Sequence, residues 1–492
     1  MKMMKYLAAA LLSALMISPA MAQDCCAKKG GQEKACSRVI QTKVPERPAG
    51  QQDMLAFRAP KLQTVRIGII GLGMRGVSAV DRLSVIEGTD VVALCDLHQD
   101  RAEKSNAILE KNGRHSATLY YGSEDAWKKL VERPDLDLIY IVTDWQTHVE
   151  MAKYAMEQGK HVAVEVPAAF SLDDIWTLID TSERTRKHCM MLENCVYDFF
   201  EMTTLNMKNK GLLGDIVYAE GGYIHNLEEF WPYYEGDWRM DYNIKHRGDV
   251  YPTHGMGPAA QILDLHRGDK MNVLVSMDTS PRNLPAYLEE VRGVKDAKVA
   301  NGQHTMTMIR TEKGRTIFIH HDVTTHRPYS RQYNIAGTKG YASKYPAEHY
   351  AFAGTDLKEA GMPAVDDLST HSWVSPEMQK ELYEKYKHPI TRELEQELYE
   401  KYKHPITREL EQRAKEVGGH GGMDFIMDYR LIYCLRNGLP LDMDVYDMAE
   451  WCALIPLSQI SLEHGFAPVE VPDFTRGAWQ RLQGYHHYMI GD

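Results

Sequence analysis

The sequence predicts an α/β protein in which a doubly wound parallel sheet is followed by an α+β domain with a large, mostly antiparallel sheet. Apolar runs of strand length alternate with helical stretches over residues 65–192, which is the pattern of a parallel sheet covered by helices. Longer strand-like runs follow residue 213. The chain has 492 residues, of which 44% are hydrophobic, and this is enough for two domains with buried cores.

The first domain is expected to occupy residues 61–212. Its first strand is the apolar run 65–70, and a helical stretch follows from residue 74 to about residue 86. The further strands expected here are 91–95, 138–142, 161–164 and 189–192. The further helices expected are 100–112, a stretch that ends near residue 158, and 171–187.

The second domain is expected to occupy residues 213–492. Its predicted strands are 216–224, 273–277, 305–309 and 316–322, and its predicted helices lie near 255–266, 423–436 and 444–463. The 16 residues 381–396 recur unchanged at 397–412. A solenoid needs at least three units, so we interpret this tandem repeat (381–412) as a duplication inside a surface helical insert.

Residues 1–22 have the pattern of a secretory signal peptide. Lys2 and Lys5 precede an apolar stretch at 7–17, and residues 20–22 form an Ala-x-Ala cleavage site. We therefore expect an exported protein, periplasmic or secreted, whose mature chain starts at Gln23. The apolar stretch is too short to span a bilayer comfortably, and no later stretch approaches that length, so no membrane span is predicted.

Residues 23–60 are rich in Lys, Gln, Gly and Pro, and we expect a linker or an arm that packs on a partner subunit of a homo-oligomer. The formal net charge of −11, without a dense run of Lys and Arg, argues against a nucleic-acid partner. Paired Cys and His spacings are absent, so no metal site is predicted. Cys25, Cys26 and Cys36 lie in the polar tail, where a disulfide or a surface role stays open. The other five cysteines have apolar neighbours and are expected to be buried: Cys95, Cys189, Cys195, Cys434 and Cys452.

A G-x-G-x-x-G motif occupies residues 71–76, directly after the first strand and before the first helix. In this context Gly71 allows a tight turn, Gly73 lets a pyrophosphate approach the backbone, and Gly76 lets helix and strand pack closely. Asp96 ends the next strand, where a carboxylate accepts hydrogen bonds from both ribose hydroxyls and repels a 2′-phosphate. The motif therefore predicts a Rossmann domain that binds NAD rather than NADP. The alternative is a glycine-rich turn without a ligand.

Polar segments follow three later strands of the same domain. Ligands bind at the carboxyl ends of parallel strands, so these segments are expected to line the cofactor, although any one of them could be an ordinary loop. They are Thr143 to His148, Glu165 to Pro167, and Glu193-Asn194.

The strand, the G-x-G-x-x-G motif, a Thr-x-x-x-x-His loop and a Glu-x-Pro segment together resemble the Gfo/Idh/MocA oxidoreductase family. Most members carry Glu-Lys-Pro, whose lysine acts as an acid or base, but Val166 takes that position here. Residues 60–490 further resemble glycoside hydrolase family 109, which is known for α-N-acetylgalactosaminidases that retain NAD. The segments that carry this resemblance are 159–169, 188–201, 223–242, 246–261 and 418–430.

The resemblance implies roles for individual residues. The residues implied to contact NAD, besides the glycines, are Met74, Arg75, Asp96, Trp145, Gln146, Thr147, His148, Glu165, Val166, Asn194 and Tyr251. Those implied to hold a sugar are Tyr223, Arg239, Tyr251, Pro252, Thr253, His254 and a later tyrosine, for which Tyr329 fits better than Tyr333.

The resemblance also implies hydrolysis through transient oxidation at C3 of the sugar, loss of the C2 proton, and departure of the aglycone. His254 is the candidate for proton transfer because an imidazole exchanges protons near pH 7, although a histidine before a helix can equally be structural. Tyr251 and Tyr197 are weaker candidates, for proton transfer or for polarising the oxyanion. Arg239 could instead form a surface ion pair. The aromatic residues at 230–238 either stack on sugar faces or form a packed loop.

Two other functions stay open at this point. An NAD-dependent sugar dehydrogenase would produce NADH and depend on added NAD, which suits an exported protein poorly because free NAD is scarce outside the cytoplasm. A non-catalytic protein that binds NAD or sugar would hold NAD without turnover.

Overall fold

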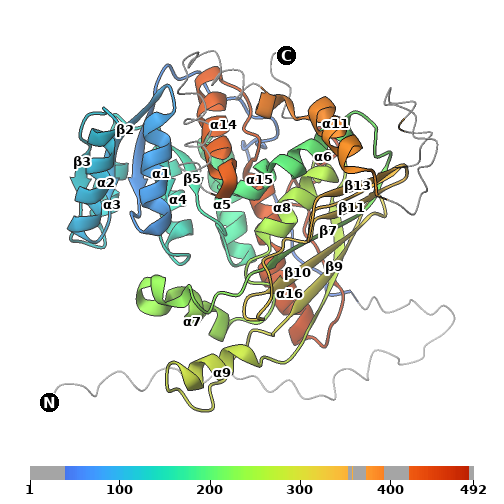
Figure 1. Ribbon diagram of the computed structural model, residues 1–492. Coiled ribbons are helices and arrows are strands. Elements are labelled where there is room, and N and C mark those ends of the chain that lie inside the picture. Colours follow the sequence, from blue (N-terminus) through green and yellow to red (C-terminus); the bar gives the residue numbers. More distant parts are fainter. Residues whose placement is uncertain (1–38, 353–356, 358–372, 393–419, 487–492) are drawn as a thin grey trace.

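The computed structural model describes residues 39–352, 357, 373–392 and 420–486, and the statements below concern these residues (Figure 1). The predicted signal peptide, Cys25, Cys26, Cys36 and the second copy of the repeat lie outside them. None of the helices within these ranges combines the length and the apolar character needed to cross a membrane.

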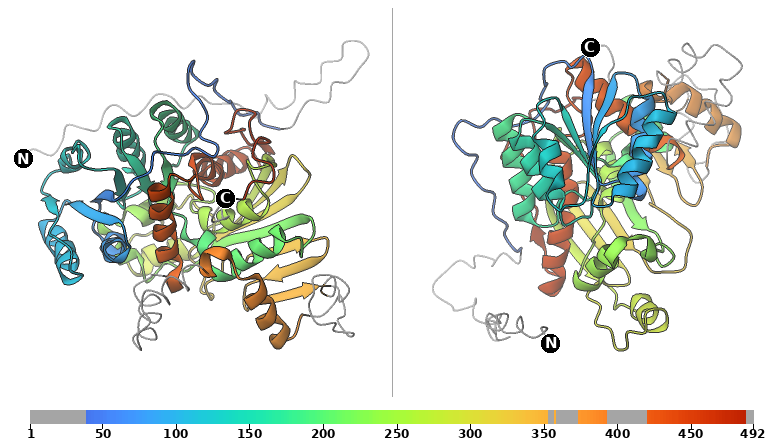
Figure 2. Two further views of the ribbon diagram at one scale, coloured as in Figure 1. Left: turned by 90° about the horizontal axis from the view of Figure 1, so that it is seen from above. Right: turned by 90° about the vertical axis from the view of Figure 1, so that its left-hand side faces the viewer.

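The first domain contains a six-stranded sheet whose neighbouring strands all run parallel, in the order β3-β2-β1-β4-β5-β6. Helices cover both faces of this sheet (Figure 2, right), so the predicted doubly wound fold is confirmed. The strands are β1 (Val65–Ile70), β2 (Thr89–Cys95), β3 (Thr118–Tyr120), β4 (Leu138–Ile141), β5 (His161–Val164) and β6 (Cys189–Met191). The helices are α1 (Met74–Val85), α2 (Gln99–Lys111), α3 (Ala126–Val131), α4 (His148–Glu157) and α5 (Leu172–Thr185).

The second sheet has eight strands in the order β13-β12-β11-β7-β10-β9-β8-β14, and among these described strands only β7 and β10 pair in parallel. The predicted mostly antiparallel sheet is thus confirmed. Its strands are β7 (Ile216–Ile224), β8 (Met271–Asp278), β9 (Thr305–Thr311), β10 (Thr316–Asp322), β11 (Asn334–Gly337), β12 (Gly340–Ser343), β13 (His349–Phe352) and β14 (Val469–Glu470). The helices that follow β6 are α6 (Phe199–Asn209), α7 (Trp238–Lys245), α8 (Thr253–Ile262), α9 (Asn283–Glu290), α11 (Pro376–Tyr386), α14 (Met423–Asn437), α15 (Val445–Cys452) and α16 (Leu454–Glu463).

One predicted helix is two helices in the structure. The expected helix 444–463 breaks at Ala453, between α15 and α16. Pro456 explains the break, because it has no N–H to donate to the carbonyl of Cys452 and its ring crowds that carbonyl.

Helix α8 lies directly against β7, and two glycines make this approach feasible. A Cβ on Gly255 would lie 2.2 Å from the backbone nitrogen of Gly222, and a Cβ on Gly221 would lie 2.3 Å from the carbonyl oxygen of Gly255. Side chains at these positions would force the helix away from the strand. The close packing fixes residues 251–254, at the start of α8, against the large sheet.

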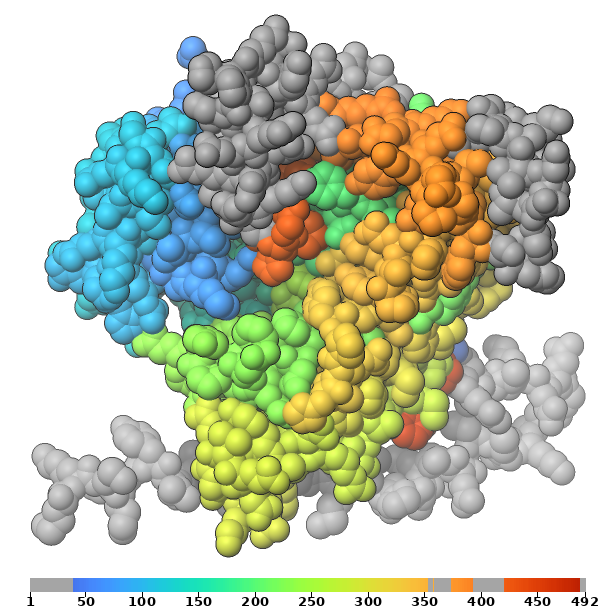
Figure 3. All heavy atoms as spheres, in the orientation of Figure 1, coloured from blue at the N-terminus to red at the C-terminus, as the bar shows by residue number. Residues whose placement is uncertain are grey.

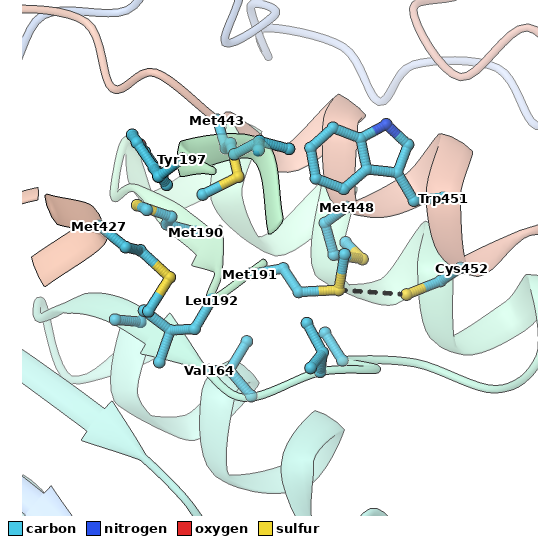
Figure 4. Close-up of a cluster of buried hydrophobic side chains, with 14 of the residues drawn as sticks. Val164, Met190, Met191, Leu192, Tyr197, Met427, Met443, Met448, Trp451 and Cys452 are labelled. Carbon is cyan, nitrogen blue, oxygen red and sulfur yellow. Dashed lines mark hydrogen bonds between the residues drawn. The ribbon is translucent and has the colours of Figure 1, made fainter. Parts of the chain in front are cut away.

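The chain returns to the first domain after the large sheet. Helix α14 packs on α1 and β1, while α15 packs on α5 and β6. Arg82 of α1 donates to Asp428 of α14 at 2.7 Å, and Tyr140 of β4 donates to the same carboxylate at 2.7 Å. Figure 4 shows the apolar cluster around β6, in which Met191 lies beside Met448 and Cys452 while Met190 lies beside Tyr197. The two sheets are therefore joined through one continuous core.

The described part of the N-terminal arm packs on its own chain. Ile40 exchanges backbone hydrogen bonds with Pro468 and Glu470, at 2.8 and 2.9 Å, and the N–H of Met54 donates to the hydroxyl of Tyr446 at 3.0 Å. The five cysteines with apolar neighbours are all buried and free, as the sequence predicts.

Candidate active site

The glycine-rich turn has the geometry that a dinucleotide requires. Gly71 has φ +90°, and a Cβ there would lie 2.5 Å from the carbonyl oxygen of Val142, while a Cβ on Gly76 would lie 1.9 Å from the carbonyl oxygen of Gly71. A Cβ on Gly73 would meet no atom within 4 Å, and no side chain caps the helix that starts after it. The first N–H groups of α1 thus face an open position, which favours a phosphate.

Asp96 lies at the carboxyl end of β2, next to this turn. Its carboxylate accepts hydrogen bonds from the backbone N–H groups of Leu72 at 2.7 Å and His98 at 2.9 Å. Each oxygen keeps a second lone pair for a further donor. Met74 is 60% exposed beside the turn. The carboxylate therefore holds the turn in shape and still has capacity for ribose hydroxyls.

The loop after β4 is tied to the segment after β5. The indole N–H of Trp145 donates to the carbonyl of Val166 at 3.2 Å, and the ring nitrogens of His148 lie 2.9 and 3.1 Å from the carbonyl oxygens of Pro167 and Thr143. Burial lowers the pKa of His148, although the hydrogen bonds to these two carbonyls oppose the shift. Its side chain is fully buried and orients both loops.

Thr147 and Gln146 occupy the turn before α4. The Thr147 hydroxyl donates to the hydroxyl of Thr143 at 2.7 Å, whereas Gln146 is exposed.

A network of ion pairs and hydrogen bonds lies at the ends of β1, β5 and β6. It joins three residues predicted from the sequence to one that was not predicted, Asp424. Arg75 donates to Glu165 at 3.1 Å and to Asp424 of α14 at 2.8 Å, and Asn194 donates to the other oxygen of Asp424 at 2.6 Å. Burial alone would raise the pKa of Asp424, but the hydrogen bond from His420 and the charges of Arg75 and Arg82 lower it well below its ordinary value.

Asp424 was not singled out from the sequence. It lies in the segment 418–430, which carries part of the family resemblance. This resemblance is the feature of the sequence that could have pointed to Asp424. A residue about 350 positions from Arg75 can be placed beside it only by the tertiary fold.

Arg239 lies in a cage of aromatic rings that come from both domains. Its guanidinium carbon lies 4.7 Å from the ring centre of Tyr251, 5.0 Å from that of Tyr234 and 5.1 Å from that of Trp145. It donates to the hydroxyls of Tyr234 at 2.5 Å and Tyr223 at 3.3 Å. The Nε atom is buried without a partner among the described residues. Arg239 is therefore a buried residue among aromatic rings and does not form the surface ion pair that was the alternative expectation.

His254 faces a carboxylate rather than capping its helix. It is the second residue of α8, and its Nδ1 lies 2.7 and 2.9 Å from the two carboxylate oxygens of Glu193. Its ring meets those of Tyr251 and Tyr223 edge to face, with centroids 4.9 and 5.4 Å apart. Pro252 and Thr253 are buried at the start of α8. The structure thus brings His254 together with Tyr223, Tyr251 and Arg239.

The two later tyrosines differ in burial. Tyr329 is 40% exposed and its ring lies 5.1 Å from that of His225, which accepts or donates a hydrogen bond at 2.9 Å with the Tyr223 hydroxyl. Tyr333 is 2% exposed, in the core. Tyr329 is therefore the exposed tyrosine of the two, and His225 connects it to Tyr223.

Tyr197 is placed apart from them. Its ring is fully buried among methionines (Figure 4), and its hydroxyl donates to Asp442 at 3.1 Å. A core tyrosine committed to this carboxylate is in no position to transfer a substrate proton, so we leave Tyr197 out of the mechanism.

The aromatic segment 230–238 is packed at one residue and exposed at another. Trp231 is fully buried, whereas Tyr233 is 71% exposed. The adjoining Glu235 binds His98 and Arg101 of the first domain, each at 2.8 Å. Figure 3 shows the light-green segment around α7 against the blue surface of the first domain. The segment thus contacts the start of α2, whose Arg101 lies 3.7 Å from Asp96.

Comparisons with known proteins agree with this geometry. A family model described as "Oxidoreductase family, NAD-binding Rossmann fold" matches residues 65–193. A second model, "Glycosyl hydrolase 109, C-terminal domain", matches residues 197–399 and 393–481. The two matched segments meet within the tandem repeat.

The chain is also similar to whole relatives. It is 59% identical over 450 residues to a "Glycosyl hydrolase family 109 protein" of Porphyromonas gingivalis, covering 92% of this chain and 93% of the relative. It is 56% identical to "Glycosyl hydrolase family 109 protein 1" of Bacteroides thetaiotaomicron, covering 92% of this chain and 94% of the relative.

Solved structures share the fold. Levoglucosan dehydrogenase in complex with NADH superposes with a TM-score of 0.60 at 16% identity, covering 83% of this chain and 100% of that chain. Scyllo-inositol dehydrogenase from Lactobacillus casei gives a TM-score of 0.55 at 12% identity, covering 84% and 99%. Sequence identity this low supports only the shared architecture, whereas the family models and relatives decide the class of enzyme. With an NAD-binding Rossmann domain joined to this C-terminal domain, the chain belongs to glycosyl hydrolase family 109 and is a glycoside hydrolase.

Proposed function

We propose that this enzyme hydrolyses terminal α-linked N-acetylgalactosamine and keeps one NAD bound through the whole cycle. The observation that carries the proposal is the cage around Arg239, because its rings come from the loop after β4 and from the start of α8. A sugar held by this guanidinium would lie beside the carboxyl edge of the parallel sheet, where a nicotinamide belongs.

The residues on that edge fit the cofactor. The open position over Gly73, the uncapped start of α1 and the carboxylate of Asp96 suit a pyrophosphate and a ribose. The residues that would hold the cofactor are Gly71, Gly73, Met74, Arg75, Gly76, Asp96, Trp145, Gln146, Thr147, His148, Glu165, Val166, Asn194 and Tyr251. When bound, NAD supplies an acceptor for the hydride from C3 of the sugar and a donor that returns it at the end of the cycle.

His254 performs the proton transfer in this proposal. Once C3 is a ketone, the proton on C2 is acidic, and His254 takes it while the aglycone leaves from C1 with the bonding electron pair. Water then adds across the C1–C2 double bond, with its hydroxyl going to C1 and a proton returning to C2. The pair of carboxylates used by most glycosidases is unnecessary for this route.

The aromatic residues around His254 bind and orient the sugar. Burial raises the pKa of Tyr223 to about 12 and that of Tyr251 well above its ordinary value, so both phenols keep their protons and donate hydrogen bonds. The Nε–H of Arg239 has no acceptor in the described part of the chain and would donate to a sugar oxygen. In this proposal Tyr329, which is partly exposed, contacts the sugar from the solvent side. Val166 fills the position of the lysine that typical dehydrogenases of this fold use as an acid or base.

The test is hydrolysis of an α-linked N-acetylgalactosaminide in deuterated water. We expect deuterium at C2 of the released sugar and no net NADH. A released sugar without deuterium would rule out the elimination. Net NADH that depends on added NAD would instead indicate a dehydrogenase, and NAD binding without turnover would indicate a binding protein.

We also propose that the protein is exported and cleaved before Gln23. An enzyme that recycles its own NAD suits a compartment where free NAD is scarce. Mass measurement of the protein recovered from the periplasm or the medium tests this: an intact N-terminus or a cytoplasmic location would contradict it. A homo-oligomer stays a prediction, which light scattering can check.

A further inference from the structure

The sequence placed Glu193 only in a segment expected to line the cofactor, yet in the structure its carboxylate contacts His254. Glu193 follows β6 in the first domain, and its side chain is fully buried. Both of its oxygens lie within 2.9 Å of Nδ1 of His254, which belongs to the second domain. A buried carboxylate of the Rossmann domain thus holds the imidazole expected to act on the sugar.

The charges decide how the imidazole is protonated. Burial alone would raise the pKa of Glu193, but the charge and hydrogen bond of His254 and the N–H of Cys195 lower it below its ordinary value. Oε1 also accepts the N–H of Cys195 at 3.0 Å, so these contacts fit an ionised carboxylate, which can only accept hydrogen bonds. Nδ1 of His254 must carry the hydrogen, and in the neutral ring Nε2 then carries the free lone pair.

A metal ion is a weaker explanation for the same group of residues. Glu193, Cys195 and His254 offer ligand atoms within 4.8 Å of one another. However, burial raises the pKa of the Cys195 thiol well above its ordinary value, and the thiol donates to Asn194 at 3.4 Å. The imidazole and the carboxylate are already in direct hydrogen-bond contact.

We infer that Glu193 is a positioning residue that fixes the orientation of His254 and its Nδ1–H tautomer, so that Nε2 is free to take the C2 proton. The inference rests on the proposed function, in which His254 exchanges a proton with the sugar. A carboxylate that orients a histidine base contributes up to about 10⁴-fold in rate in the catalytic triads of proteases.

Replacing Glu193 by Gln should install the wrong tautomer. The N–H of Cys195 donates to Oε1 of Glu193 at 3.0 Å, so the amide oxygen of Gln is expected to keep that place. The amide nitrogen then faces Nδ1 of His254 and donates to it, which leaves the hydrogen on Nε2.

For Glu193→Gln in the full-length enzyme we expect kcat to fall about 100-fold or more, with KM and NAD content within about twofold of wild type. The acidic limb of the kcat–pH profile should move to lower pH, because the negative charge that favours an imidazolium is gone. Glu193→Asp keeps the charge, so its kcat should be intermediate and its acidic limb unchanged.

A second buried glutamate–histidine pair supplies the matched control. Glu450 contacts Nδ1 of His266 at 2.9 Å, and this pair lies outside the site. Glu450→Gln should lower the melting temperature without changing kcat or its pH profile. In a His254→Ala background, Glu193→Gln should have no further effect on turnover.

Three results would overturn the inference: wild-type kcat and pH profile in Glu193→Gln, the same loss of kcat in the His254→Ala background, or an Nε2–H tautomer. The tautomer is measured on the wild-type enzyme by ¹⁵N NMR of labelled histidine, and the His254 signal is assigned by its absence in His254→Ala. This measurement does not require Glu193→Gln to fold. Absence of C2 deuterium in wild type would reject the proposed function alone, because the tautomer can still be determined.

Discussion

Trp145 and Tyr251 stack on each other across the boundary between the two domains, with ring centroids 5.7 Å apart and an angle of 27° between the planes. Trp145 comes from the loop after β4 of the parallel sheet, and Tyr251 precedes helix α8 on the large sheet. The contact places Trp145, which is expected to contact the cofactor, directly beside Tyr251, which is expected to contact both cofactor and sugar. Four predictions test the site and the surrounding structure.

His254→Ala should lower kcat by about 100-fold or more, the usual contribution of a positioned acid or base. NAD content should stay at the wild-type level, because the cofactor residues are untouched. His464→Ala, at the exposed end of α16, serves as a control and should keep wild-type kcat. Turnover in His254→Ala equal to that of the control would remove His254 from the mechanism.

Asp96→Asn should weaken NAD binding by about tenfold, the loss of about one charge-assisted hydrogen bond. It should also admit NADP, because the charge that repels a 2′-phosphate is gone and Arg101, 3.7 Å from the carboxylate, can pair with the phosphate. Binding is measured by titrating protein freed of its cofactor. Asp100 is an exposed carboxylate on α2, the helix that carries Arg101. Asp100→Asn should change neither the affinity for NAD nor that for NADP. An unchanged NAD preference in Asp96→Asn would contradict the assigned role.

Asp424→Asn should release NAD faster, by about tenfold, because the amide cannot satisfy both Arg75 and Asn194. The measurement is the NAD that stays with the protein through gel filtration. Asp428→Asn, on the same α14 and paired with Arg82, should reduce stability but keep NAD. The prediction fails if the two variants retain NAD equally.

Asp249→Asn should stabilise the protein at alkaline pH. Asp249 is buried, and burial raises its pKa from 3.8 to about 7. A carboxyl group whose pKa is higher in the folded state contributes stability below pH 3.8 and loses it as the pH rises through about 7. The variant removes this cost, which is about 1.4 kcal/mol for each pKa unit, and Asn keeps an acceptor for the N–H of Tyr251.

The gain in melting temperature of Asp249→Asn over wild type should therefore be larger at pH 8 than at pH 5. Asp241→Asn, an exposed residue of α7 paired with Lys245, should show no such difference. A gain that is equal at both values of pH would mean that Asp249 is not the titrating group.

Local sequence was sufficient for most elements of the parallel sheet. Runs such as 65–70 and 161–164 are apolar throughout because both faces of such strands are buried, and they match β1 and β5. The short strands β3 and β11 to β14 were not predicted, because two to four residues carry too little pattern to separate a strand from a loop. Pro456 was a visible signal for the break between α15 and α16, although the apolar periodicity suggested one helix.

The sequence by itself determined the dinucleotide turn, the acidic residue after β2 and the family, because these depend on residue types at fixed short spacings. Only the tertiary structure decided which distant residues share the site. Glu193 meets His254, Asp424 meets Arg75, Tyr329 lies exposed beside His225 while Tyr333 is buried, and Tyr197 lies in the core. Each of these outcomes depends on how two sheets pack through α8, α14 and α15, and local spacing carries no information about side chains that meet across hundreds of residues.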